Sequence, residues 1–170
     1  TFIFAQLAKN LENACIKARR YNLAATRLII FLRTKEFRNT GIELKLSRPT
    51  AYPSDLFGPL REGFKCIYRH DNFYRQTGIV LAGLVSETGF QYTLFDDPAR
   101  IEKMSRIYHA VDELSKKFGK YTVRHAASLP TKIQAQHEGE RGDVPQRATD
   151  LFMGENKRQR LGLPLLHIKV

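Results

Sequence analysis

The feature that most constrains the fold is a pair of consecutive amphipathic strands predicted within residues 26–49. In the first strand, Leu28, Ile30 and Leu32 alternate with other residues, so these apolar side chains share one face of the pleat. The second strand alternates in the same way, and residues 39–41 are predicted to form a turn or bulge between the two. Alternation of period two over both runs predicts a sheet that buries one face and exposes the other.

The exposed face of this sheet is predicted to be basic, because its polar positions are mostly Arg, Lys and Thr. Cations on a sheet suit a flat, wide and negatively charged partner, and a nucleic-acid duplex is the commonest partner of that kind. The 170 residues include 28 Lys and Arg against 17 Asp and Glu, a formal net charge of +11. Charge alone is equally compatible with a solvated surface. Ile29, Phe31 and Val80 argue against pure solvation, because on the same face they would be exposed unless a partner covers them.

One helix is predicted before the strand pair in the chain and another after it. Residues 4–21 repeat apolar positions at intervals of three and four, and a second helix is predicted to start from Ser54 as its N-cap with Leu56 and Leu60 inward. A third strand, YRQTGIVLAGL, follows at residues 74–84. Helix, two strands, helix and strand is the pattern of an α+β fold with an antiparallel sheet and two helices on one face. The other face is then free for a ligand.

The pattern changes after residue 86. The next residues are predicted to be a linker that displays the short apolar peptide QYTLF, whose simplest interpretation is an anchor to the core. A third helix is predicted to begin at Pro98 with Asp97 as its cap. The apolar residues expected to face inward on that helix are Ile101, Met104, Ile107, Val111 and Leu114.

The remaining chain is predicted to add a strand at residues 120–127, a mobile loop at about 128–148, and an apolar C-terminal run that pairs with the strand. We therefore predict three parts. They are a sheet domain at residues 1–86, a linker at 87–97, and a small helix-plus-strands extension at 98–170.

No group of residues in the sequence predicts catalysis or metal binding. The five histidines have no ligand-like spacing, and the acidic pair before Pro98 fits a helix cap. Cys15 and Cys66 have no CxxC or Cys/His pattern around them, which predicts buried free thiols in a reducing cytoplasm. The longest apolar run is far shorter than the about 20 residues that span a bilayer, so no membrane contact is expected. The chain begins without Met, which we interpret as a fragment of a longer protein.

The run NLAATRLIIFLRTKEFRNTGIELKLSRPT, followed by a helix and YRQTGIVLAGL, resembles the little-finger domain of Y-family translesion DNA polymerases, of the bacterial polymerase IV and polymerase V catalytic-subunit kind. The resemblance covers about residues 4–84. Further on, QYTLFDD, a helix and KYTVRHAAS resemble the C-terminal extension of the polymerase V type. The resemblance implies four antiparallel strands and two helices that lie against duplex DNA near the primer terminus and hold it mainly by its backbone.

The resemblance also implies residue roles. The strand pair and the start of the third strand would face the DNA, and the candidate DNA-binding residues are Arg27, Arg33, Lys35, Arg38, Lys45, Arg75, Gln76 and Thr77. In such polymerases, QLxLF-like peptides after the little finger bind the hydrophobic groove of the ring-shaped sliding clamp. Gln91, Leu94 and Phe95 match that pattern, and Tyr92 departs from the usual Leu.

Two departures from the family pattern bear on function. The palm and fingers domains are absent, and with them the carboxylates that bind Mg²⁺ and the nucleotide, so the chain holds no cofactor of its own and no activity is expected from it alone. The family's first strand should precede the first helix, whereas this chain begins almost at that helix. The resulting open sheet edge would permit a homodimer or strand swapping.

The first hypothesis is therefore a DNA-gripping, clamp-tethered C-terminal part of a cytoplasmic bacterial lesion-bypass polymerase. Its partners would be duplex primer–template DNA, the sliding clamp and the remaining polymerase core. The second hypothesis is an RNA-binding sheet platform that stacks bases on exposed aromatics such as Phe31. The third is a protein-interaction domain whose basic face is incidental.

Overall fold

The computed structural model describes residues 1–87, 97–118 and 122–133. Residues Thr1–Ile133 form one compact unit. The described helices and strands, in chain order, are α1 (Phe2–Arg20), β1 (Leu23–Thr34), β2 (Asn39–Thr50), α2 (Pro53–Ile67), β3 (Tyr74–Ser86), α3 (Pro98–Phe118), the short 3₁₀ helix η2 (Ala126–Ser128) and α4 (Pro130–Ile133).

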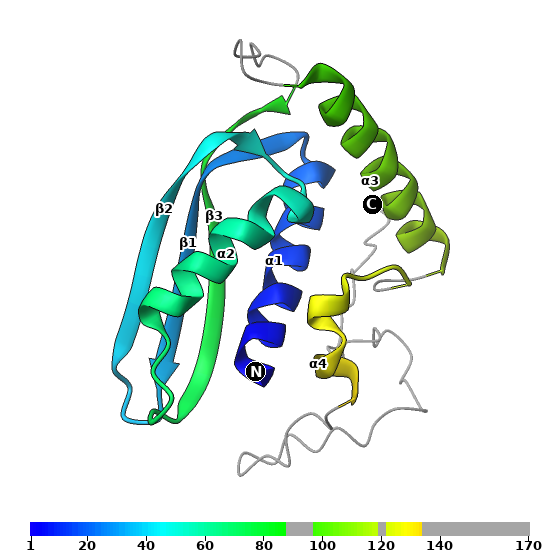
Figure 1. Cartoon of the computed structure of the whole chain (residues 1–170). Coiled ribbons are helices and arrows are strands. Elements are labelled where there is room, and N and C mark those ends of the chain that lie inside the picture. The colour runs from blue at the N-terminus through cyan, green and yellow to red at the C-terminus, as the bar shows by residue number, and fades with distance from the viewer. Residues whose placement is uncertain (88–96, 119–121, 134–170) are drawn as a thin grey trace, which may run out of the picture. The chain divides into compact units, whose positions relative to one another are not determined.

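The described strands form a three-stranded antiparallel sheet of order β2-β1-β3. Ile30 at the centre of β1 lies opposite Ile42 on one neighbour and Ile79 on the other. Helices α1 and α2 lie on the same face of this sheet (Figure 1). The predicted α+β fold is thus confirmed, with three described strands where the family resemblance implied four.

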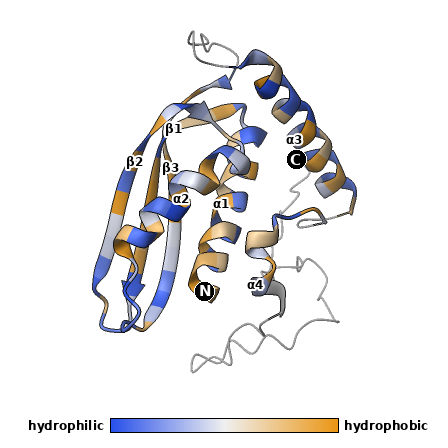
Figure 2. Cartoon of the chain, in the orientation of Figure 1, coloured by the Kyte–Doolittle hydropathy of each residue, from blue (hydrophilic) through white to orange (hydrophobic). Residues whose placement is uncertain are grey.

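The core lies between the sheet and these two helices. Leu28, Ile30 and Leu32 are fully buried, as the alternation along the chain predicted, and they meet Leu11 of α1 and Leu60 of α2. Figure 2 shows the alternation of hydrophilic and hydrophobic residues along the strands. Each buried aliphatic side chain of this kind contributes about 1.5–3 kcal/mol relative to an exposed one.

The turn between β1 and β2 differs from the predicted one. Asn39 and Gly41 belong to β2, and Gly41 lies opposite Phe31 within the ladder. The turn is made by the residues after Thr34, whose carbonyl accepts from the Phe37 N–H over 3.1 Å and whose hydroxyl accepts from the Arg38 N–H over 3.3 Å. The glycine thus serves the close approach of a side chain within the sheet and not the reversal of the chain.

The start of α2 also differs from the prediction. The helix begins at Pro53 with Tyr52 as its N-cap residue, so Ser54 lies inside the first turn. Asp55 is held at this end of the helix, where its Oδ2 accepts from Arg48 Nη2 over 2.6 Å and from the Thr50 hydroxyl over 3.0 Å.

Helix α3 begins as predicted, and three of its five predicted inward residues, Ile101, Met104 and Val111, are half-buried. The Arg100 N–H donates to Asp97 Oδ1 over 3.2 Å, which confirms the cap. Tyr108 is buried, whereas Ile107 and Leu114, both predicted to face inward, are 42% and 40% exposed. Tyr108 is buried because both its ring and its hydroxyl have partners on other segments. The Tyr108 ring stacks on Tyr52 with centroids 5.3 Å apart, and its hydroxyl accepts the Ser54 N–H over 3.1 Å.

The predicted strand at residues 120–127 is wrong over its described part, because residues 122–127 contain no strand and lead into η2. Buried Glu12 of α1 accounts for this local structure. Its Oε1 accepts from the His125 N–H over 2.9 Å and from the Ser128 hydroxyl over 3.0 Å, so a side chain takes the place of a strand as the partner of the His125 N–H. The predicted domain boundaries near residues 86 and 98 stay a prediction.

The two cysteines are free, and they differ in exposure. Cys15 is buried, and burial raises the pKa of its thiol to about 12. Cys66 is exposed on α2, so the prediction of a buried thiol was wrong at that position. It lies on the outer surface of the helix, whereas Gly63 and Ile67 lie on the buried surface. None of the helices in the described ranges has the length and apolar character to cross a bilayer.

Candidate nucleic-acid interface

One face of the sheet is turned away from α1 and α2, and we call it the open face. Residues paired across antiparallel strands point to the same side of a sheet, so the register defines its members. They are Arg27, Ile29, Phe31 and Arg33 on β1, their partners Lys45, Glu43, Gly41 and Asn39 on β2, and Ala82, Val80, Gly78 and Gln76 on β3.

The centre of the open face is flat and apolar because Phe31 lies between two glycines. A Cβ atom at Gly78 would lie 2.0 Å from the Phe31 ring, and one at Gly41 would lie 3.3 Å from the Phe31 Cβ. The ring therefore covers the β3 backbone at Gly78. Val80, 44% exposed, continues this surface beside Ile29. An exposed apolar patch of this kind fits a binding surface better than a solvated one.

Cations flank the apolar centre at one side. Arg27 and Lys45 are direct cross-strand partners, so both project from the open face. Arg27 Nη1 donates to Glu43 Oε1 over 2.9 Å, and both side chains of this pair are about half exposed, at 49% and 47%. An exposed ion pair contributes only about 0–1 kcal/mol. Arg27 can therefore exchange this carboxylate for another anion at little cost.

The eight predicted DNA-binding residues do not all share this face. Arg27, Arg33, Lys45 and Gln76 lie on the open face, whereas Lys35 and Arg38 belong to the β1–β2 turn at one end of it. Thr77 is on the opposite face, where Asn10 of α1 donates to its hydroxyl over 3.1 Å and to its carbonyl over 3.2 Å. Adjacent residues of a strand point to opposite sides, so Gln76 and Thr77 cannot both face one partner.

Arg75 lies where the register shifts, since Arg33 pairs with Gln76 but the next residue of β1, Thr34, pairs with Tyr74. The extra residue turns its guanidinium toward the β1–β2 turn, where it lies 4.3 Å from the centroid of the Phe37 ring. The Arg33 guanidinium lies 4.9 Å from the same ring. The structure thus gathers two of the predicted cations around an exposed aromatic side chain.

Phe37 and Phe73 are the residues that the sequence analysis missed. They are 57% and 70% exposed, and the Lys35 Nζ lies 5.3 Å from the Phe73 ring centroid. The available signal was local, because each Phe stands in a short loop close to an arginine, in KEFR and in NFYR.

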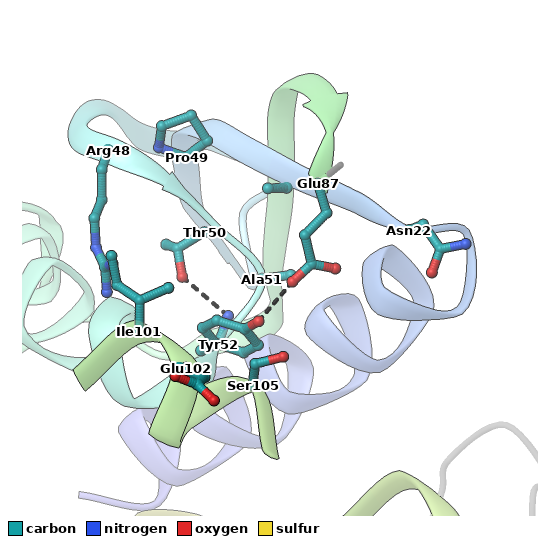
Figure 3. Close-up of a pocket in the computed structure, with 11 residues that line it drawn as sticks. Asn22, Arg48, Pro49, Thr50, Ala51, Tyr52, Glu87, Ile101, Glu102 and Ser105 are labelled. Atoms are coloured by element: carbon teal, nitrogen blue, oxygen red, sulfur yellow. Dashed lines mark hydrogen bonds between the residues drawn. The ribbon is translucent and has the colours of Figure 1, made fainter. Parts of the chain in front are cut away.

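A cavity of about 360 Å³ lies between the far end of the sheet and α3 (Figure 3). Tyr52 extends into this region and donates to Glu87 Oε1 over 2.5 Å. Burial and this hydrogen bond raise the pKa of Tyr52 to about 12. The Tyr52 N–H also donates to the Thr50 hydroxyl over 3.1 Å, so these polar groups are partnered within the protein. Within the described ranges, no cluster of His, Cys, Asp or Glu could hold a metal ion. The predicted clamp-binding residues Gln91, Leu94 and Phe95 lie outside the described residues.

Comparison with known proteins shows the family of this chain. Residues 3–94 match the model of the impB/mucB/samB family C-terminal domain, which is more than half of the chain. The chain belongs to this family. DNA polymerase IV of Moorella thermoacetica is 31% identical over 125 residues, which cover 70% of this chain and 30% of that polymerase. No solved structure matches the chain.

The family match confirms that the chain is a C-terminal region of a Y-family DNA polymerase. The match contains all three described strands and helices α1 and α2, whereas α3, η2 and α4 follow it in the chain. The chain spans less than a third of the length of the curated relative. The open face is therefore part of the impB/mucB/samB C-terminal domain itself.

Proposed function

We propose that the open face binds the duplex of primer–template DNA by its sugar–phosphate backbone, as the DNA-gripping part of a lesion-bypass polymerase. The observation that carries the proposal is the direct pairing of Arg27 with Lys45 on the face turned away from α1 and α2. Family membership supports DNA as the polyanion. The remaining polymerase core would supply the Mg²⁺ site and the chemistry of nucleotide addition.

The open face suits contacts that do not depend on base sequence. Lys and Arg neutralise phosphates and release counterions, and such contacts position a duplex without reading its bases. The flat Phe31 ring above Gly78 offers apolar area at the centre of this face. When a phosphate approaches, Arg27 exchanges Glu43 for it. The expected result is a grip that tolerates a distorted template.

A salt titration tests this proposal. Binding of the chain to a labelled duplex should weaken linearly in a plot of log affinity against log salt, with a slope of about −0.9 per phosphate contacted. Duplexes of different sequence should bind alike. Lys45→Ala should reduce the slope by about one. Lys65→Ala, which removes an exposed cation from α2 on the covered side, is the matched control and should change nothing. A flat salt response would reject phosphate contact.

We also propose, from the sequence, that the peptide QYTLF tethers the polymerase to the ring-shaped sliding clamp. A tether raises the local concentration of an enzyme whose own grip is weak. Replacing Leu94 and Phe95 together by Ala should abolish capture by a bacterial sliding clamp and leave duplex binding intact. Tyr92→Leu, which restores the family pattern, should strengthen capture. Equal loss of clamp and duplex binding in the double variant would mean that the peptide is structural.

Phe31 also favours a second candidate, an RNA-binding platform, because a ring that lies flat on a strand can stack a base. A higher affinity for single-stranded RNA than for duplex DNA would decide for this candidate. Failure to bind any nucleic acid at low salt would decide for a protein-interaction domain.

A further inference from the structure

Two exposed phenylalanines, Phe37 and Phe73, lie at the same end of the sheet, and we call them the aromatic tip. Phe37 belongs to the β1–β2 turn and Phe73 to the loop before β3, and both segments lie at the same end of the sheet (Figure 1). A backbone hydrogen bond joins the two segments, because the Lys35 N–H donates to the Phe73 carbonyl over 2.8 Å. Their exposed fractions of 57% and 70% show that neither ring contributes to the core.

The backbone at Phe37 is unfavourable for a residue with a side chain. Its φ of 64° lies in the left-handed region that favours glycine. The Phe37 N–H donates to the Thr34 carbonyl, and the Thr34 N–H donates to the Arg38 carbonyl over 3.0 Å, which is the pattern of a three-residue hairpin loop with a left-handed last residue. Glycine would satisfy this turn without strain. The fold therefore has no need of the Phe37 ring, and a ligand would account for it.

The charges around the tip identify the class of ligand. The guanidinium groups of Arg33 and Arg75 lie 4.9 and 4.3 Å from the Phe37 ring centroid, and the Lys35 Nζ lies 5.3 Å from that of Phe73. Glu36 is the acidic residue in the turn. Aromatic rings interleaved with cations are the arrangement that binds single-stranded nucleic acid, because bases stack on rings and on guanidinium planes while cations meet the phosphates.

We propose that the aromatic tip stacks on an unpaired base where single-stranded template DNA leaves the duplex held by the open face. This inference rests on the proposed function. Arg33 makes the two surfaces continuous, because it lies on the open face opposite Gln76 and its guanidinium reaches the Phe37 ring. A template DNA strand that runs along the open face toward this end therefore reaches the tip at the point where its base pairing ends.

The test compares a blunt duplex with the same duplex carrying an unpaired 5′ extension of the template strand, both bound to the 170-residue chain. The extension should tighten binding about fivefold or more, as expected for stacking of a base on an aromatic ring. The double variant with Phe37→Gly and Phe73→Ala should lose this gain and bind the blunt duplex unchanged. A 2-aminopurine at the first unpaired position should be quenched by the original chain and not by the variant.

Two controls keep the result interpretable. Phe118→Ala removes an equally exposed ring, 61% exposed and 5.2 Å from Lys117 Nζ, from α3, and it should leave the gain intact. The double variant with Phe37→Tyr and Phe73→Tyr should retain the gain, because the rings remain. A gain that persists in the double variant with Phe37→Gly and Phe73→Ala, or no gain in the original chain, would overturn the inference while blunt-duplex binding upholds the proposed function. Failure of the original chain to bind either DNA would overturn both the inference and the proposed function.

Discussion

The guanidinium of Arg19 and the carboxylate of Asp112 form two parallel hydrogen bonds, Nε to Oδ2 and Nη2 to Oδ1, each 2.7 Å long. Arg19 lies on α1 in the family-matched region, and Asp112 lies on α3 beyond it. The Arg19 side chain is only 8% exposed, and it also donates to the Ala51 carbonyl over 2.8 Å. This pair thus fixes α3 to the domain that precedes it.

Asp112→Ala is expected to destabilise the chain by about 2 kcal/mol, because it leaves a largely buried guanidinium without its carboxylate. Urea unfolding followed by circular dichroism measures the change. Glu62→Ala breaks the exposed pair with Lys65, whose side chains are 68% and 64% exposed, and should cost about 0.5 kcal/mol or less. Equal losses in the two variants would show that the Arg19 pair adds nothing beyond a surface contact.

The free energy of unfolding should decrease as the pH falls below 6.5, because of His125. Burial lowers the pKa of this side chain, and the nearby Glu12 carboxylate offsets part of the effect. Below the ordinary value of 6.5 the unfolded chain binds more protons than the folded one, so the free energy of unfolding decreases until the lowered folded pKa is passed. His125→Asn should lessen this decrease in thermal unfolding across pH 5–7. His70→Gln removes an imidazole that is 90% exposed and serves as the matched control.

Gly63→Ala should destabilise the core by about 1–3 kcal/mol. A Cβ atom there would lie 2.5 Å from Ile30 Cδ1 and 3.0 Å from Leu44 Cδ1, both beneath α2. Ile30→Val removes the first of these methyl groups, so the double variant should lose less stability than the sum of the two single variants. Additive losses, measured by denaturant unfolding, would show that the clash is relieved by movement of the whole helix.

Glu43→Gln should increase affinity for duplex DNA severalfold, because it removes a carboxylate from the open face and releases Arg27 from its ion pair. The gain should shrink as salt is added, since exposed charges are screened. Fluorescence anisotropy with a labelled duplex measures it. Glu62→Gln removes the same charge from the exposed surface of α2 and should leave affinity nearly unchanged. A similar gain from both variants would indicate a general charge effect and not a local one.

The sheet could be predicted because its alternation has a period of two, which assigns the residues from Arg27 to Arg33 to faces. The buried set of Leu28, Ile30 and Leu32 follows from that period, and so does the exposed side for Arg27 and Lys45, whereas their direct pairing depends on the strand register. The same rule excludes Thr77 from the face of Gln76. The family resemblance alone had placed both residues on the DNA.

The remaining misses involve contacts between segments that are distant in the chain. Tyr108 is the buried residue of α3 because its ring contacts Tyr52 and the Arg19 guanidinium. No pattern within the sequence of α3 predicts these two contacts. Gly41 was predicted to be a turn residue, but it lies opposite Phe31 within the sheet. The aromatic tip depends on the backbone hydrogen bond between Lys35 and Phe73. Each loop carries a Phe near an Arg, but nothing in either sequence indicates that the two loops meet.

Glu12 gives the contact between α1 and η2 an unusual character. It places a carboxylate, not an aliphatic group, beneath His125 and Ser128, and its bonds there are to a backbone N–H and a hydroxyl. Water can replace both donors, so the Glu12 carboxylate would still find hydrogen-bond partners if this segment moved away from α1.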